Sequence, residues 1–176
     1  MAIKKSLFLT DYVFKGSHCD KVLALTSKID ADSNSYIFSS SVELFIFASL
    51  VGCYFNRRCK PERSTGKETK IMVSQFLEHK NDINLAFRFV LLTGGRDKTD
   101  VTERLNRTFR NPETEDNYAL FEEYMLGGVD EIYEHLILSS NTHYEDYLTS
   151  LNKLLDEIRR VEPDDGSVDI SNEDFF

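Results

Sequence analysis

The most constraining feature of the sequence is an apolar run from Val42 to Phe55, which reads VELFIFASLVGCYF. Ser40 stands three residues before Glu43 at the head of this run, and that spacing is the capping-box pattern of a helix N-terminus. Apolar side chains would cover nearly the whole circumference of this helix, so we expect it at the centre of the fold. The run carries Glu43 and is shorter than the roughly 20 residues that a membrane-spanning helix needs, which predicts no membrane association.

Other segments repeat apolar residues at helical spacing. The segment Ile83–Leu91 predicts one helix, with Asp82 as its N-cap and with Gly94 and Gly95 stopping it. A shorter amphipathic helix is expected to open at Asp100.

A long C-terminal helix is predicted after Thr142, which forms a second capping box with Glu145. With 176 residues and 41% hydrophobic content, the chain suits one core. We therefore predict an all-α fold, a single compact domain of six to eight helices over residues 1–161. We predict an acidic C-terminal tail over residues 162–176.

Two adjacent glycines, Gly127 and Gly128, interrupt an amphipathic pattern that continues on both sides of them. A phosphate-binding loop would need a preceding strand and a Lys followed by Ser or Thr, whereas Asp130 and Glu131 follow here and would repel phosphate. We interpret the pair as a structural corner, where one helix ends and the next begins.

Charge is segregated along the chain. Residues 51–110 hold thirteen basic and seven acidic side chains, a net of +6, and residues 111–176 hold three basic and eighteen acidic, a net of −15. Two interpretations stay open: the basic and acidic parts pair within the fold, or they serve a bipolar adaptor. The predicted contacts to a nucleic acid or a partner are Arg57, Arg58, Lys60, Arg104, Arg107 and Arg110.

The three cysteines, with His18 beside Cys19, raise the question of a zinc site. The Cys-x-x-Cys spacing is absent and Cys53 falls on the central apolar run, so we interpret Cys19, Cys53 and Cys59 as core thiols. An odd cysteine count and an N-terminus without a secretory signal favour the cytoplasm. We predict no metal, no cofactor and no catalytic residue.

The C-terminal helix and tail form the second predicted contact region. The helix carries a heptad-like apolar seam that packs either on its own domain or on a partner helix, and the tail ends in acids followed by two phenylalanines. A partner-docking arm is the interpretation we favour, and its residues are Leu151, Leu154, Ile158, Asp174, Phe175 and Phe176.

Three segments carry a resemblance to a known family: FIFASLVGCYFNRR, NLAFRFVLLTGG and LFEEYMLGGVDEIYEHL. They resemble segments of small proteins associated with bacterial DNA phosphorothioation (Dnd) and related anti-phage loci, over roughly residues 35–138. The resemblance implies an accessory role in defence against foreign DNA and transfers no catalytic residue.

These observations together predict a non-enzymatic adaptor subunit of an anti-phage defence complex, bridging an ATPase or nuclease partner. One rival is a small metal-dependent nuclease that uses the acids around the glycine pair, Glu122 among them. The other rival is a DNA-binding regulator that uses the basic residues.

Overall fold

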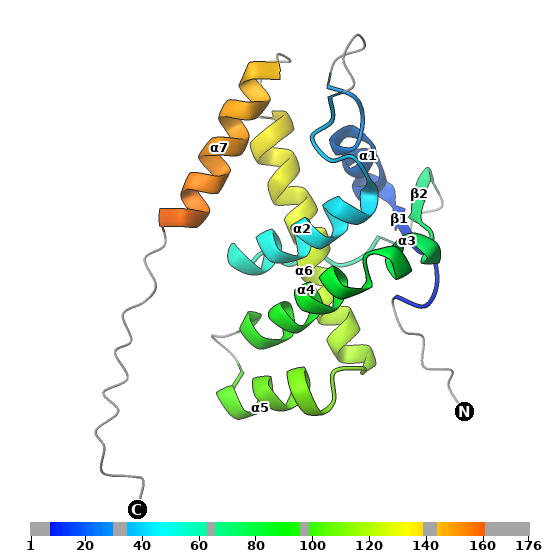
Figure 1. Cartoon of the computed structure of the whole chain (residues 1–176), viewed down its shortest axis with the longest axis vertical. Helices are drawn as coiled ribbons and strands as arrows, with labels where there is room; N and C mark the ends of the chain where they lie inside the picture. Colours follow the sequence, from blue (N-terminus) through cyan, green and yellow to red (C-terminus); the bar gives the residue numbers. More distant parts are fainter. Residues whose placement is uncertain (1–7, 30–34, 63–65, 96–98, 139–143, 161–176) are drawn as a thin grey trace, which may run out of the picture.

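Figure 1 shows the computed structural model of the chain, which describes residues 8–29, 35–62, 66–95, 99–138 and 144–160. Its elements are β1 (Tyr12–Lys15), α1 (Gly16–Leu25), α2 (Ser41–Tyr54), β2 (Glu68–Ile71), α3 (Val73–Glu78), α4 (Lys80–Thr93), α5 (Val101–Leu105), the π-helical turn η1 (Asn106–Arg110), α6 (Glu115–Tyr133), the π-helical turn η2 (Glu134–Leu138) and α7 (Tyr144–Arg160). Seven α-helices and one small sheet in these residues confirm the predicted compact, mostly helical domain.

Helices α2 and α6 form the centre of the fold. α6 runs along the long axis of the molecule, and α2 crosses it near its middle (Figure 1). Leu44 and Phe45, on different sides of α2, are both fully buried, which confirms the predicted central position of this helix. None of the helices in the described residues combines the length and the apolar character needed to cross a bilayer.

The start of α2 follows the predicted cap. The Ser40 side chain accepts a hydrogen bond from the backbone N–H of Glu43 at 3.3 Å. The Glu43 carboxylate in turn accepts hydrogen bonds from the backbone and hydroxyl of Ser39. The first of these bonds satisfies an N–H group that the first helical turn leaves without a partner, and the other two hold the residue before the cap.

Gly127 and Gly128 lie inside α6, so the predicted corner is wrong. The helix runs unbroken from Glu115 to Tyr133 and continues into η2. A Cβ atom on Gly128 would lie 1.8 Å from the carbonyl oxygen of Ala48 in α2, far closer than any real contact. The glycines are needed for close approach between two segments and not for a turn.

The same close contact is repeated on neighbouring glycines. A Cβ on Gly52 of α2 would lie 1.9 Å from the Tyr124 carbonyl oxygen, and one on Gly127 would lie 2.1 Å from that of Arg57. Backbone therefore packs on backbone where α6 meets α2 and the segment that follows it.

A small sheet was not predicted. β1 pairs antiparallel with β2, with Tyr12 opposite Ile71 and Lys15 opposite Glu68. Tyr12 and Phe14 face the core while the residues between and after them do not, which is the strand period. Strands of four residues are too short for this alternation to stand out from the sequence alone.

Helix α4 begins at Lys80, so Asp82 lies in its first turn and the prediction that Asp82 is the N-cap is wrong. The helix ends at Thr93, directly before Gly94, as predicted. Asp100 caps α5, accepting a hydrogen bond of 2.9 Å from the backbone N–H of Thr102.

Helix α7 packs on its own domain. Leu154 is fully buried, and Leu151 and Ile158 are partly buried against the core. Leu154 is therefore occupied within the chain, and the prediction that it binds a partner is wrong, whereas partner contacts of Leu151 and Ile158 stay a prediction. The remaining residues of the predicted docking arm, Asp174, Phe175 and Phe176, lie outside the described residues.

Candidate functional site

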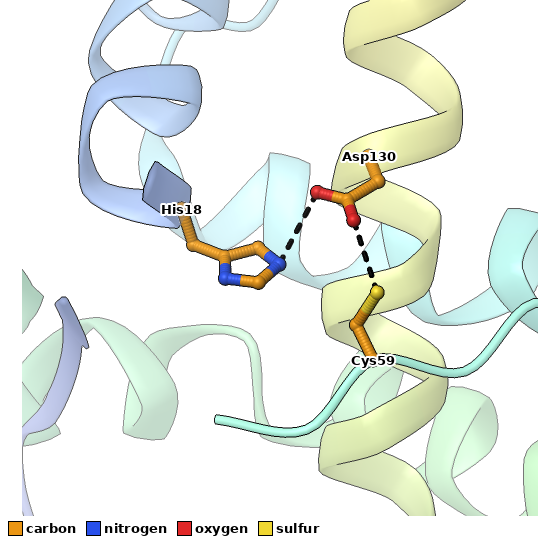
Figure 2. A group of neighbouring side chains, drawn as sticks. All are labelled: His18, Cys59 and Asp130. Carbon is orange, nitrogen blue, oxygen red and sulfur yellow. Dashed lines mark hydrogen bonds and ion pairs between the residues drawn. The ribbon is translucent and has the colours of Figure 1, made fainter. Parts of the chain in front are cut away.

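Asp130 lies at the centre of a polar cluster built by three segments of the chain (Figure 2). It projects from α6, His18 comes from α1, and Cys59 comes from the segment after α2. Asp130 Oδ1 lies 3.2 Å from His18 Nε2, and Asp130 Oδ2 accepts a hydrogen bond of 3.0 Å from Cys59 Sγ. One ligand atom from each of the three residues lies within 4.8 Å of the other two, so together they could hold a metal ion.

The cluster is buried and its charge is partly compensated. His18 is 4% exposed and Asp130 is 7% exposed, and Lys21 Nζ donates to Asp130 Oδ1 at 2.7 Å. Burial acts to raise the pKa of Asp130, but the contacts with His18, Cys59 and Lys21 outweigh it and hold that pKa well below its ordinary value. Asp130 is therefore an anion inside the fold.

The thiol of Cys59 is not an activated nucleophile. Burial, followed by the hydrogen bond to Asp130, raises the pKa of the Cys59 thiol to about 11. Reactive cysteines have pKa values below the ordinary thiol value, so Cys59 stays protonated at neutral pH in this arrangement.

A second carboxylate lies on the far side of the His18 ring. Glu62 Oε1 is 3.7 Å from His18 Nδ1 and accepts a hydrogen bond of 3.1 Å from the backbone N–H of Ser17. Both ring nitrogens of His18 are buried, and neither has a hydrogen bond to any described residue. The ring is held between two carboxylates, with Asp130 at Nε2 and Glu62 at Nδ1.

Backbone contacts hold the three segments in place. Gly16 has a positive φ of 60°, which lets α1 begin directly after β1 and places His18 in its first turn. After α2 the chain turns at Asn56, whose φ is 52°, and the Cys59 N–H donates to the Glu123 carbonyl at 2.9 Å. Cys59 is thereby fixed beside α6.

The sequence did not predict this cluster. Cys59 was expected as a core thiol and Asp130 as an acid that would repel phosphate, and the two are 71 positions apart. His18 and Cys59 show no metal-ligand spacing along the chain. The one local signal is the position of Asp130 directly after an apolar stretch of α6 that is buried from Tyr124 to Val129.

The basic segment after α2 pairs with α6. Arg57 donates to Glu131 at 2.7 Å and to Glu134 at 2.7 and 2.6 Å, and Arg58 is hydrogen-bonded to Glu123. Of the two interpretations of the segregated charge, pairing within the fold is therefore the one observed here. Lys60 is exposed.

The predicted basic residues of the α5 region have mainly a capping role. Arg107 Nε donates to the Leu91 carbonyl at 2.7 Å, its Nη2 donates to the Gly94 carbonyl, and Arg104 Nη1 donates to the Leu92 carbonyl at 3.2 Å. These carbonyls belong to the end of α4, where backbone oxygens lack helical partners. Arg104 and Arg107 are therefore engaged within the fold, and their predicted contact with a nucleic acid or a partner stays a prediction.

A hollow of about 630 Å³ brings three of the six predicted basic residues together. Acidic residues line it in equal number, so it does not present one sign of charge to a polyanion. The charged residues around it are Arg58, Arg107, Arg110, Glu103, Asp116 and Glu123.

An apolar groove of about 870 Å³ lies between α2, α4 and α7. On the α4 side its walls include Leu85, which is 72% exposed, and Phe89, which is 46% exposed. Phe47 of α2 and Ile158 of α7 line it as well. Large apolar side chains exposed around a groove are typical of a binding surface.

The segments that carry the family resemblance meet at Tyr124. The Tyr124 hydroxyl accepts a hydrogen bond of 2.9 Å from the Gly95 N–H and donates one of 2.9 Å to Asn56 Oδ1. The guanidinium of Arg58 lies 5.6 Å from the centre of the Tyr124 ring. These residues therefore link the end of α2, the end of α4 and the middle of α6, which is a structural role.

Comparisons with protein-family models, with curated proteins and with solved structures find no match for this chain. Its own features define it as a mostly helical domain, built on the crossing of α2 with α6, with a buried His-Cys-Asp cluster and an apolar groove.

Proposed function

We propose that the protein is a non-enzymatic adaptor subunit that binds a helix of a partner protein in the groove between α2, α4 and α7. The observation that carries the proposal is the exposure of Leu85 and Phe89 on the wall of a groove of about 870 Å³. Helix-in-groove recognition uses such a surface, because a few large apolar side chains of the incoming helix fill the space between two walls.

The proposed partner segment is an amphipathic helix with basic residues beside its apolar face. Asp82 is the charged residue among those lining the groove in the described part of the chain. α7, which forms one wall, carries four acidic and three basic side chains. Lys or Arg flanking the apolar face of the partner would pair with Asp82 at the edge of the groove.

The two rival functions receive less support. A nuclease that used Glu122 would need this carboxylate free for a metal, but it accepts a hydrogen bond of 2.9 Å from the Tyr12 hydroxyl. A DNA-binding regulator would need free basic residues, but Arg57 and Arg58 are paired with acids of α6 and Arg107 caps α4.

The biological setting of the proposal rests on the resemblance to accessory proteins of DNA phosphorothioation and related anti-phage loci. In that setting, the partner is an ATPase or nuclease subunit, and the chain joins it to the rest of the complex. Neither binding the partner nor joining it to the complex requires catalysis by this protein.

The test compares groove variants in cells that carry the complete locus. The double variant Leu85→Ser, Phe89→Ser should abolish phage protection. It should also abolish recovery, with the tagged chain, of the ATPase or nuclease encoded at the same locus. Leu23→Ser is the matched control, since Leu23 is 46% exposed on α1, and it should preserve both. Protection or partner recovery at the wild-type level in the groove variant would overturn the proposal.

Two assays on the purified chain address the rivals. Incubation with DNA or RNA and Mg²⁺ or Mn²⁺ should give no turnover, and turnover abolished by Glu122→Gln would establish the nuclease instead. DNA binding that weakens steeply with salt would establish the regulator.

A further inference from the structure

We propose that His18, Cys59 and Asp130 bind a zinc ion, with Glu62 orienting the histidine. The site is independent of the proposed adaptor function, because it lies between α1, α6 and the segment after α2, and the groove lies between α2, α4 and α7. Imidazole nitrogen, thiolate sulfur and carboxylate oxygen are the ligand types that zinc prefers in proteins.

The separations of the ligand atoms suit one small ion. Zinc bonds of about 2.0–2.3 Å in tetrahedral geometry place pairs of ligand atoms about 3.3–3.8 Å apart. The Asp130 oxygens are already 3.2 Å from His18 Nε2 and 3.0 Å from Cys59 Sγ. Side-chain shifts of about half an ångström to an ångström would open the space for the metal.

The two nitrogens of His18 face the partners that a zinc-binding histidine has. Nε2 points toward Asp130, on the side where Cys59 also lies (Figure 2), and Glu62 Oε1 is 3.7 Å from Nδ1. Metal-bound histidines generally donate their second ring N–H to a carboxylate or carbonyl, which fixes the tautomer and the ring orientation. Zinc at Nε2 would replace the 3.2 Å contact that this buried nitrogen makes with Asp130 Oδ1.

The charges around the site balance when zinc is bound. Zinc and the ammonium of Lys21 supply three positive charges, and the Cys59 thiolate, Asp130 and Glu62 supply three negative ones. Lys21 contacts Asp130 Oδ1, which leaves Oδ2, the oxygen now bonded to the Cys59 thiol, for the metal. Binding replaces the thiol proton with zinc and releases that proton to solvent, and a water completes the fourth position.

A bound zinc would join α1, the segment after α2, and α6. These segments supply residues 18, 59 and 130, so one ion would link parts of the chain that are distant in sequence. Since zinc would bind the folded arrangement in preference to the unfolded chain, it should raise the melting temperature.

The test uses the full chain, reduced and freed of metal, titrated with Co²⁺ and Zn²⁺ alone. Co²⁺ should bind one per chain with the thiolate-to-cobalt absorption band in the near ultraviolet and with ligand-field bands of tetrahedral intensity. Cys59→Ser should lose the thiolate band, and His18→Gln should weaken Co²⁺ binding. The control Cys53→Ser should keep the thiolate band and bind Co²⁺ as tightly as the wild type. Glu62→Gln should weaken Zn²⁺ binding by about 10- to 100-fold without removing the thiolate band.

A measurement on the unaltered chain keeps the test independent of variant folding. Zn²⁺ should slow alkylation of Cys59, mapped by mass spectrometry, and raise the melting temperature. The absence of stoichiometric Co²⁺ binding, or Zn²⁺ that leaves Cys59 alkylation unchanged, would overturn the proposal. A thiolate band that survives in Cys59→Ser would do the same.

Discussion

The backbone of Gly128 in α6 lies directly against the carbonyl group of Ala48 in α2. A Cβ atom on Gly128 would lie 1.8 Å from the Ala48 oxygen and 2.8 Å from the backbone nitrogen of Gly52. The two central helices therefore meet without side chains between them at this point. Any residue larger than glycine must move one helix away from the other.

Gly128→Ala should destabilise the fold, although alanine is the better helix former. At an exposed helix position the change would favour the helix by about 1 kcal/mol. Here the forced separation of α2 and α6 should outweigh that gain, with a net loss of about 1–3 kcal/mol or more. Urea unfolding followed by circular dichroism measures the difference.

Gly66→Ala is the control for this substitution, because a Cβ atom at Gly66 would meet no atom within 4 Å. Its unfolding midpoint should stay close to that of the wild type. A Gly128→Ala protein as stable as the wild type would show that the helices do not cross this closely.

The sequence predicted the helices well where the determinants are local. The Ser40 cap and the apolar circumference of α2 lie within one short segment, and both are confirmed. The role of Gly128 depends on Ala48 and Gly52, which are distant in sequence. Glycine pairs at a helix end and at a helix crossing look alike in sequence, so the prediction of a corner was wrong for a physical reason.

The polar cluster was unpredictable for the same reason. His18, Cys59 and Asp130 come from three segments, and no one segment contains a ligand spacing. The sequence showed a net charge of +6 in residues 51–110 and −15 in residues 111–176. Only the fold specifies that Arg57 meets Glu131 and Glu134. Composition predicted that charges could pair and gave no information on which ones.

Tyr12→Phe should destabilise the protein in a pH-dependent way. The Tyr12 hydroxyl donates to Glu122 Oε1 at 2.9 Å and joins β1 to α6. Burial raises the pKa of Glu122, and the hydrogen bond from Tyr12 opposes that rise, so the substitution should raise this pKa further. The carboxylate is the form that the Tyr12 bond stabilises.

The direction of this pH dependence follows from the raised pKa of Glu122. A carboxyl group whose folded pKa is raised opposes folding above that pKa, where it is charged, and this penalty disappears as the pH falls below the unfolded value. The loss of stability in Tyr12→Phe should therefore be largest near pH 7 and smaller near pH 4. Urea unfolding at both pH values measures it, with Tyr36→Phe, at an exposed position, as control. An equal loss at both pH values would contradict the coupling.

Arg107→Ala should destabilise the end of α4. The guanidinium donates to the carbonyls of Leu91 and Gly94, and hydrogen bonds to a charged group contribute about 1.5–3 kcal/mol. Arg110→Ala, which removes an exposed arginine from the same turn, should change stability by less than about 0.5 kcal/mol. Amide hydrogen exchange at the C-terminal turn of α4 should accelerate in the first variant alone. Equal exchange rates in the two variants would mean that Arg107 does not cap the helix.

Leu154→Ala should show whether α7 belongs to the domain. Leu154 is fully buried, and removing a buried leucine costs about 2–5 kcal/mol because the lost apolar contacts leave a cavity. Leu148, on the same helix, is 43% exposed, and Leu148→Ala should have an effect of about 0.5 kcal/mol or less. If α7 packs as described, the two variants should differ clearly in their unfolding midpoints, and α7 should unfold together with α2 and α6. Equal stability of the two variants would mean that α7 is not docked in solution, and the groove between α2, α4 and α7 would then lose one of its walls.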